Sequence, residues 1–232
     1  MNSSSRPAEV APAPGRPVLW PGLAFALIGS IAFSGKAIIV KLAYRHGVDA
    51  VTVLMLRMLF ALPLFLALAW WSGRGRPVLT RRDWGTVLGL GFSGYYLASF
   101  LDFLGLAYIS ASLERLILYL NPTLVLLLGV LLHGRKVSAK QLLALAVSYG
   151  GVMLVFGHEL SDLGPNVGLG ALLVFGSALS YAVYLVQSGQ EVKRLGSLRL
   201  TGLATTVACL LCIGQFLLLR PVASVQIGRA HV

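Results

Sequence analysis

The chain has 232 residues, a mean hydropathy of +0.82 and a formal net charge of +11 at pH 7. Hydrophobic residues make up 57% of it and charged residues only 12%, which excludes an ordinary soluble domain. The positive charge does not indicate a nucleic-acid-binding protein, because the basic residues are dispersed through short connections and form no basic face. We therefore expect the lipid bilayer as a partner, and no nucleic acid.

Residues 1–17 are rich in Pro, Ala and Ser, and we expect a disordered cytoplasmic tail there. Seven apolar stretches follow, each long enough for a helix to cross about 30 Å of hydrocarbon. They lie at residues 20–42, 51–71, 84–108, 112–132, 141–157, 168–187 and 200–219. Their apolar runs are continuous rather than alternating, so the predicted fold is an all-α polytopic membrane protein with seven transmembrane helices.

Basic residues in the connections predict the orientation of these helices. Lys and Arg gather after spans two, four and six: Arg74, Arg76, Arg81, Arg82, Arg135, Lys136, Lys140, Lys193, Arg194 and Arg199. The connections that follow spans one, three and five are nearly free of them. By the positive-inside rule, we expect a cytoplasmic N-terminus and a multi-pass protein of the cell inner membrane.

Five ionisable residues interrupt the apolar spans: Lys36, Arg57, Asp102, Glu114 and Arg115. A charge in hydrocarbon costs at least about 2.5 kcal/mol and tends to face a partner or water. At about 1.5 Å per residue, Lys36, Arg57 and Asp102 fall roughly 10 Å below the outer boundary, and Glu114 and Arg115 lie slightly shallower, so the five form one charged layer. Complete pairing of the three positive and two negative groups would leave one cation to bind an anionic group of a substrate. Alternatively, Lys36 reaches toward the headgroups, Arg57 and Asp102 form a structural ion pair, and Glu114 and Arg115 mark a helix start beside the headgroups.

Polar residues follow these charges at helical spacing. Tyr95, Ser99 and Asp102 share a face of span three, and Glu114 and Asn121 share a face of span four. In span six, the corresponding stripe is Ser177, Tyr181, Tyr184 and Gln187. Such stripes are typical of helices that line a wet cavity, and equally of helices that pack through hydrogen bonds.

Other spans contain residues that affect helix shape and packing. Pro63 and Pro122 are expected to kink spans two and four. The glycines of spans three and five are expected mainly to allow close helix packing; these are Gly85, Gly89, Gly91, Gly94, Gly150 and Gly151. Cys209 and Cys212 are interpreted as packing residues beside Thr205 rather than as a redox pair.

Four short motifs, taken in order, resemble the EamA module of the drug/metabolite transporter superfamily. They are residues 107–112 (AYISAS), Leu120-Asn121-Pro122, residues 132–137 (LHGRKV) and residues 149–152 (YGGV). The resemblance implies two inverted five-helix units around a central cavity. On this basis, residues 18–157 form the first unit and residues 158–226 form a partial second unit with its first two helices. Residues 227–232 look like translated sequencing adapter, so a C-terminally truncated chain is expected.

The resemblance predicts a secondary transporter that moves a small polar or amphipathic metabolite by alternating access. The expected substrate contacts are Lys36, Arg57, Tyr95, Ser99, Asn121, Tyr181, Tyr184 and Gln187. Asp102 and Glu114 are expected to carry protons if transport is proton-coupled, or to form ion pairs. No sequence motif indicates a cofactor or metal, so the partner is a small-molecule substrate, and a homodimer is left open.

Two other functions are considered. A membrane scaffold or assembly subunit would explain seven helices without truncation, although it explains the charged layer poorly. The sequence Gly91-Phe92-Ser93-Gly94 fits the pattern around the serine of intramembrane proteases, but the histidines His46, His133 and His158 lie at span ends. We therefore do not expect an enzyme.

Overall fold

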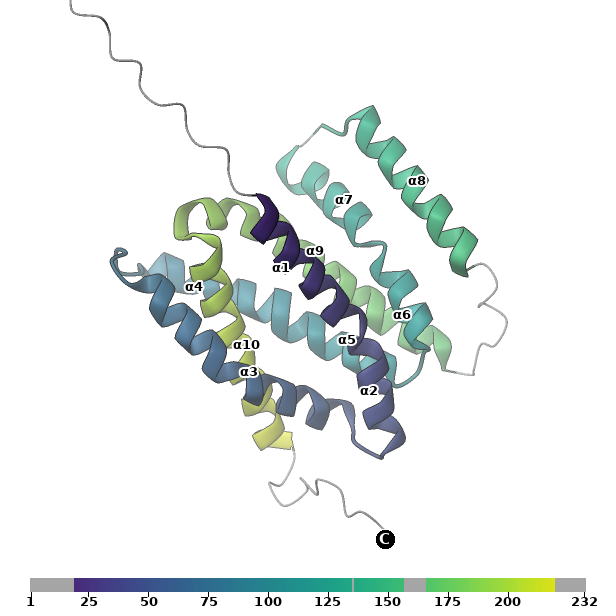
Figure 1. The fold of residues 1–232 in the computed structure, drawn as a ribbon, viewed down its shortest axis with the longest axis horizontal. Helices are drawn as coiled ribbons and strands as arrows, with labels where there is room; N and C mark the ends of the chain where they lie inside the picture. The colour runs from purple at the N-terminus through teal and green to yellow at the C-terminus, as the bar shows by residue number, and fades with distance from the viewer. Residues whose placement is uncertain (1–18, 135, 157–165, 220–232) are drawn as a thin grey trace, which may run out of the picture. The chain divides into compact units, whose positions relative to one another are not determined.

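The computed structural model describes residues 19–134, 136–156 and 166–219, and every regular element within them is helical (Figure 1). In chain order these are α1 (Leu19–Ser34), α2 (Lys36–Arg45), α3 (Ala50–Gly73), α4 (Arg81–Leu90), the π-helix η1 (Gly91–Leu97), α5 (Ala98–Leu106), α6 (Ala111–Leu118), α7 (Asn121–His133), α8 (Ala139–Phe156), α9 (Val167–Leu195) and α10 (Ser197–Leu219). The all-helical class is confirmed for these residues. The predicted tail at 1–17, the boundary region at 157–165 and the suspected adapter at 227–232 lie outside them.

Six helical stretches within the described residues are long and apolar enough to cross a membrane. They are Gly22–Arg45, Ala50–Gly73, Arg81–Leu106, Ala111–His133, Val167–Leu195 and Ser197–Leu219, which correspond to predicted spans one to four, six and seven. Helix α8 occupies the position of predicted span five, but the side chains of its last five residues lie outside the described part. The chain is thus a multi-pass membrane protein, and a seventh span stays a prediction.

The described helices divide into two compact units, residues up to Lys36 and residues from Ala37 onward. The first consists of α1, whose described side chains are largely exposed, as expected of a helix that faces lipid. Its last turn is followed by Gly35, where the helical hydrogen bonding of span one is interrupted before α2 begins. The first span is therefore two helical segments rather than one.

The core of the second unit is built around α10 and α9. Helix α10 packs along α3 and against η1, whereas α9 packs along α5, η1, α6 and α7. Cys209 and Cys212 are buried against α3, with the Sγ of Cys209 3.7 Å from the Sδ of Met58. Their interpretation as packing residues beside the buried Thr205 is confirmed.

Spans three and four are interrupted near their middles. In span three, seven residues from Gly91 to Leu97 form a π-helix, a rare element that often lies at functional sites. In span four, α6 ends at Leu118 and α7 begins at Asn121, so Pro122 stands in the first turn of a new helix. A proline fits there because the first-turn N–H groups have no intrahelical acceptor. The kink predicted at Pro122 is thus a break, whereas α3 continues through Pro63.

The glycines of span three have two different environments. A Cβ at Gly91 would lie 2.5 Å from the carbonyl oxygen of Ala204 on α10, and a Cβ at Gly94 would overlap the ring of Tyr184 on α9. Gly85 and Gly89, in contrast, have open space where a Cβ would be. Close packing therefore explains the two π-helical glycines, and it does not explain Gly85 and Gly89.

Candidate functional site

The π-helix of span three is held to α9 by serine hydroxyls. The Ser180 hydroxyl donates to the carbonyl oxygen of Ser93 at 2.7 Å, and the Ser177 hydroxyl donates to that of Ala98 at 2.7 Å. A π-helix shifts the regular backbone hydrogen bonds by one residue, so carbonyls around it need other donors. Helix α9 supplies two of them: Ser177 belongs to the stripe that the sequence predicted, and Ser180 does not.

Next to these serines lies a group of three tyrosines, Tyr95, Tyr181 and Tyr184. The hydroxyls of Tyr95 and Tyr184 are 2.9 Å apart and form a hydrogen bond, with their rings edge to face at 5.0 Å. The ring of Tyr181 stacks on that of Tyr184 at 5.6 Å. Tyr184 is buried, while the other two are half-buried. This group presents aromatic surface and hydroxyl groups together, which suits a substrate with both apolar and polar parts.

The tyrosine group lies near the middle of its two spans. Tyr95 is about 21 Å along the stretch that begins at Arg81, and Tyr184 is about 25 Å along the longer α9. The two stretches contain 26 and 29 residues, so both positions are close to half-way. This depth is where secondary transporters place their substrate sites.

Asp102 and Arg57 lie at a second location, between α3 and α5. Asp102 is buried, and the positive charge of Arg57 interacts with it. The guanidinium of Arg57 also lies over the ring of Phe103 at 5.5 Å. The Tyr44 hydroxyl donates to the carbonyl oxygen of Phe103 at 2.6 Å, which ties α2 to the same turn of α5. These contacts fit either an ion pair with a structural role or a charged site.

Glu114 and Asn121 lie on either side of the break in span four. Glu114 is fully buried, and its Oε2 is 3.3 Å from the Nε of Arg115. The side-chain oxygen of Asn121 is buried and accepts no hydrogen bond from the described residues. A buried acceptor without a donor is costly, and a bound water or substrate could supply one. The broken span thus places buried polar groups within the apolar layer.

The remaining predicted site residues do not join these groups. Ser99 is half-buried on α5, and Gln187 is exposed on α9 beyond the tyrosines. Lys36 belongs to the unit that ends there, and its ammonium lies over the ring of Phe33 at 5.3 Å. Of the five residues in the predicted charged layer, Lys36 lies in the first unit and the other four lie in the second unit. The structure therefore gives the relative positions of those four residues only.

A charged cluster lies where span three begins and span six ends, and it was not predicted as a site. Arg194 on α9 forms ion pairs with Asp83 on α4 and with Glu191, the latter at 2.7 Å. Arg76 donates to the carbonyl of Leu195, and Arg199 donates to that of Pro77 at 3.1 Å. The sequence signal that could have located the start of α4, and with it Asp83, is the spacing of Thr80 and Asp83, which form a capping box there.

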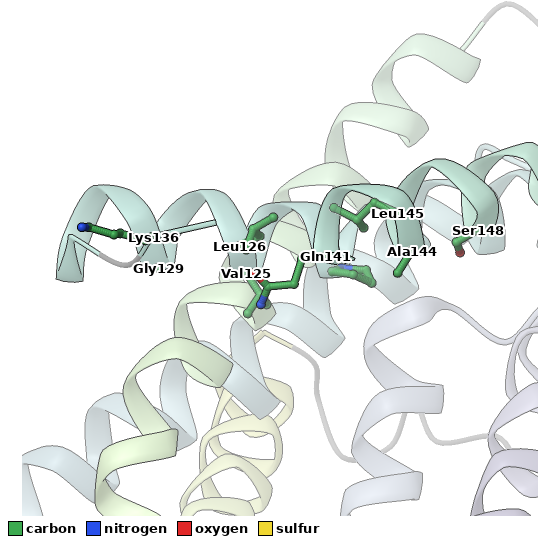
Figure 2. A pocket seen from close by; sticks show the side chains of 9 residues that line it. Val125, Leu126, Gly129, Lys136, Gln141, Ala144, Leu145 and Ser148 are labelled. Carbon is green, nitrogen blue, oxygen red and sulfur yellow. The ribbon is translucent and has the colours of Figure 1, made fainter. Parts of the chain in front are cut away.

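A pocket of about 500 Å³ lies between α7 and α8. Its α7 wall is Pro122, Val125, Leu126 and Gly129, and its α8 wall is Gln141, Ala144, Leu145 and Ser148; Lys136 of the connection completes it (Figure 2). Tyr149 and Thr123 form a hydrogen bond that joins the two helices. Apart from Pro122, which follows Asn121, the pocket is separate in sequence from the predicted site.

The described residues contain no group of three or more His, Cys, Asp or Glu side chains placed to hold a metal ion. Ser93, considered above as a nucleophile, donates its hydroxyl to the Gly89 carbonyl at 2.9 Å. This bond to a carbonyl four residues earlier is common for serine in membrane helices. The geometry around Ser93 is thus explained by helix structure.

The model of the EamA-like transporter family matches residues 20–157, more than half of the chain. The chain belongs to the EamA-like transporter family. The uncharacterized transporter YcbK of Bacillus subtilis is 32% identical over 188 residues, which cover 81% of this chain and 60% of that protein. The uncharacterized transporter YetK of the same organism is 24% identical over 169 residues, covering 72% and 51%. No solved structure matches the chain.

Membership of the EamA-like family confirms the resemblance carried by the four motifs. The family match covers α1 to α8, so the π-helix and the broken span four both lie inside it. Helices α9 and α10 lie beyond it. This EamA-like chain spans 60% and 51% of the length of the two relatives.

Proposed function

We propose that this EamA-like chain is a secondary transporter that moves a small polar or amphipathic metabolite across the inner membrane by alternating access. The observation that carries the proposal is the polar layer between η1 and α9, where Ser180 and the Tyr95–Tyr184 pair meet at mid-span. Interrupted helices in membranes occur where the backbone is buried in protein or lines a cavity.

The position of this layer fits a transporter built from inverted units. If the first five spans form one unit and α9 begins the second, η1 belongs to one unit and α9 to the other. Substrate sites of such transporters lie at mid-membrane where the two units meet. Relative movement of α9 and η1 would then open the tyrosine group to one side of the membrane or the other.

The chemistry of the site supports the substrate class. Tyr181 and Tyr184 offer aromatic faces, while hydroxyl groups and the unpaired oxygen of Asn121 select a hydrogen-bonding solute. In this proposal Arg57 attracts an anionic group of the substrate, with Ser99 and Gln187 as further polar contacts, and Lys36 stays a substrate contact predicted from the sequence alone. Asp102 and Glu114 then serve as the groups that exchange protons, and an ion or substrate gradient supplies the energy.

Transport by the purified full chain in proteoliposomes tests the proposal. Vesicles are loaded with an isotope-labelled mixture of amino acids, nucleosides and organic acids, and mass spectrometry measures which solutes leave when unlabelled mixture is added outside. We expect exchange of at least one solute, reduced about fivefold by Tyr184→Phe, because a lost hydrogen bond to substrate costs about 1 kcal/mol. Tyr108→Phe, an exposed tyrosine at the span end, is the matched control.

Proton coupling is tested in the same vesicles. Glu114→Gln and Asp102→Asn should abolish accumulation driven by an imposed pH gradient while solute exchange continues, because exchange needs no net proton movement. If neither variant changes accumulation, these carboxylates do not carry the protons. If no solute is exchanged by wild-type protein and both variants alter only abundance or assembly, the chain is a scaffold.

A further inference from the structure

The pocket between α7 and α8 has an apolar body and a basic mouth. Val125, Leu126 and Leu145 form much of its wall, and Lys136 lies at one end (Figure 2). At the other end Thr123 and Tyr149 join the two helices by a hydrogen bond. The groove thus has a basic residue at one end and a hydrogen bond between its two helices at the other.

The length of the groove corresponds to one leaflet of a bilayer. Pro122 and Gly129 are seven residues apart, so the α7 wall is about 10 Å long, and Lys136 extends the site beyond it. Half of the hydrocarbon core is about 15 Å thick. The groove therefore begins near one membrane surface and ends near the middle of the bilayer, as an acyl chain does.

The described charges beside the mouth are positive. Lys136 lies in the connection and lines the pocket, Lys140 lies in the first turn of α8, and the sequence has no acidic residue between Glu114 and Glu159. Lys136 and Lys140 are exposed. Because no acidic side chain of this region neutralises them, the two lysines are available to a phosphate at the level of the headgroups.

We propose that this groove binds an anionic phospholipid, with one acyl chain between α7 and α8 and the headgroup phosphate on Lys136 and Lys140. The lipid would fill the space that separates the two helices and hold α8 against the rest of the second unit. The proposal concerns lipid binding and does not depend on which solute, if any, the chain transports.

Native mass spectrometry of the purified full chain in detergent measures this binding directly. The probes are dioleoyl-phosphatidylglycerol and dioleoyl-phosphatidylcholine, which share acyl chains and differ in charge. We expect tighter binding of phosphatidylglycerol, with a loss of about fivefold for Lys136→Gln and a similar further loss for Lys140→Gln. Lys193→Gln, an exposed lysine at the end of α9, is the control and should change nothing.

A second pair of variants locates the acyl chain. Ala144→Phe places a ring in the groove, whereas Ala146→Phe makes the same change on an exposed residue of α8 outside it. Only Ala144→Phe should reduce binding of both lipids. The control Ala146→Phe should leave both lipid binding and the melting temperature unchanged. If Ala144→Phe fails to fold, a spin-labelled acyl chain broadening the signals of groove residues in wild-type protein provides the same information.

Four outcomes would overturn the proposal. Equal binding of the two lipids removes the charge argument, and unchanged binding in both Ala144→Phe and Lys136→Gln places the lipid elsewhere. Full competition by free glycerol 3-phosphate would indicate a site for a soluble anion. A dimer that dissociates in Ala144→Phe would mean that a second copy of the chain occupies the groove.

Discussion

Arg194 near the end of α9 forms an ion pair with Asp83 in the first turn of α4, so two spans that are separated by more than a hundred residues are joined at one end. Asp83 is buried and also accepts a hydrogen bond from the Thr80 backbone N–H at 2.8 Å, whereas Arg194 is about half exposed. Asp83 therefore both caps α4 and pairs with Arg194, whereas Arg194 forms ion pairs with Asp83 and Glu191 and caps no helix of the described part.

This difference predicts unequal effects of substitution. Asp83→Ala should lower the melting temperature more than Arg194→Gln, because it removes the helix cap as well as the ion pair. The effect of Arg194→Gln should diminish at high salt, since a half-exposed pair is screened. Thermal unfolding in detergent at low and high salt measures both, with Lys193→Gln as control. Equal effects of the two variants would contradict the capping role.

The buried cysteines predict slow thiol labelling of the native protein. Cys209 and Cys212 are the two cysteines of the chain, and they are 0% and 2% exposed. A maleimide dye should label neither in the folded protein and both after thermal unfolding. Rapid labelling of native protein would mean that α10 separates readily from α3. If the prediction holds, the same dye reports unfolding in the other experiments.

Gly91 and Gly89 are expected to respond in opposite directions to the same change. Gly91→Ala should lower the free energy of unfolding by about 1–3 kcal/mol, because the new methyl group meets the Ala204 carbonyl oxygen. Gly89→Ala should raise it by about 0.5–1 kcal/mol, since alanine favours the helix and has open space there. Equilibrium unfolding of both variants measures the difference. Similar values would contradict the close approach of η1 to α10.

Ser180→Ala removes the hydroxyl that donates to the Ser93 carbonyl. We expect a loss of about 0.6–1.7 kcal/mol, the range measured for hydrogen bonds between membrane helices. Ser72→Ala is the control, because the Ser72 hydroxyl donates at 2.6 Å to the Leu68 carbonyl of its own helix. The measurement is again equilibrium unfolding. A larger effect at Ser72 would show that α9 does not stabilise the π-helix through Ser180.

The pair Tyr95 and Tyr184 can be examined by a double-mutant cycle. Each Tyr→Phe substitution removes the same hydrogen bond between η1 and α9, so the double variant should lose less stability than the sum of the two single variants. Unfolding of the three variants and the wild type gives the coupling free energy. Full additivity would contradict a direct contact between the two hydroxyls.

The candidate site was predicted in part because helical spacing is local information. The spacing of Ser177, Tyr181 and Tyr184 placed them on one stripe of span six, and the structure brings Ser177 and Tyr184 onto span three. Gln187 belongs to the same stripe and is nevertheless exposed, since α9 extends beyond the tyrosine contact. Periodicity gives the face of a helix, whereas the neighbouring helix decides which part of that face is covered.

The sequence by itself determined the helical class and the positions of six spans, because a backbone in hydrocarbon must satisfy its own hydrogen bonds and apolar length is visible locally. The sequence also marked Pro122, where span four breaks, whereas tertiary structure alone decided that span three forms a π-helix. The π-helix at Gly91–Leu97 depends on hydroxyls from α9, some ninety residues away, and on glycines that admit Tyr184 and Ala204. The pairing of Asp83 with Arg194 likewise required two span ends to meet in space. Hydropathy reports the energy of a segment in lipid, but these contacts depend on which segments become neighbours.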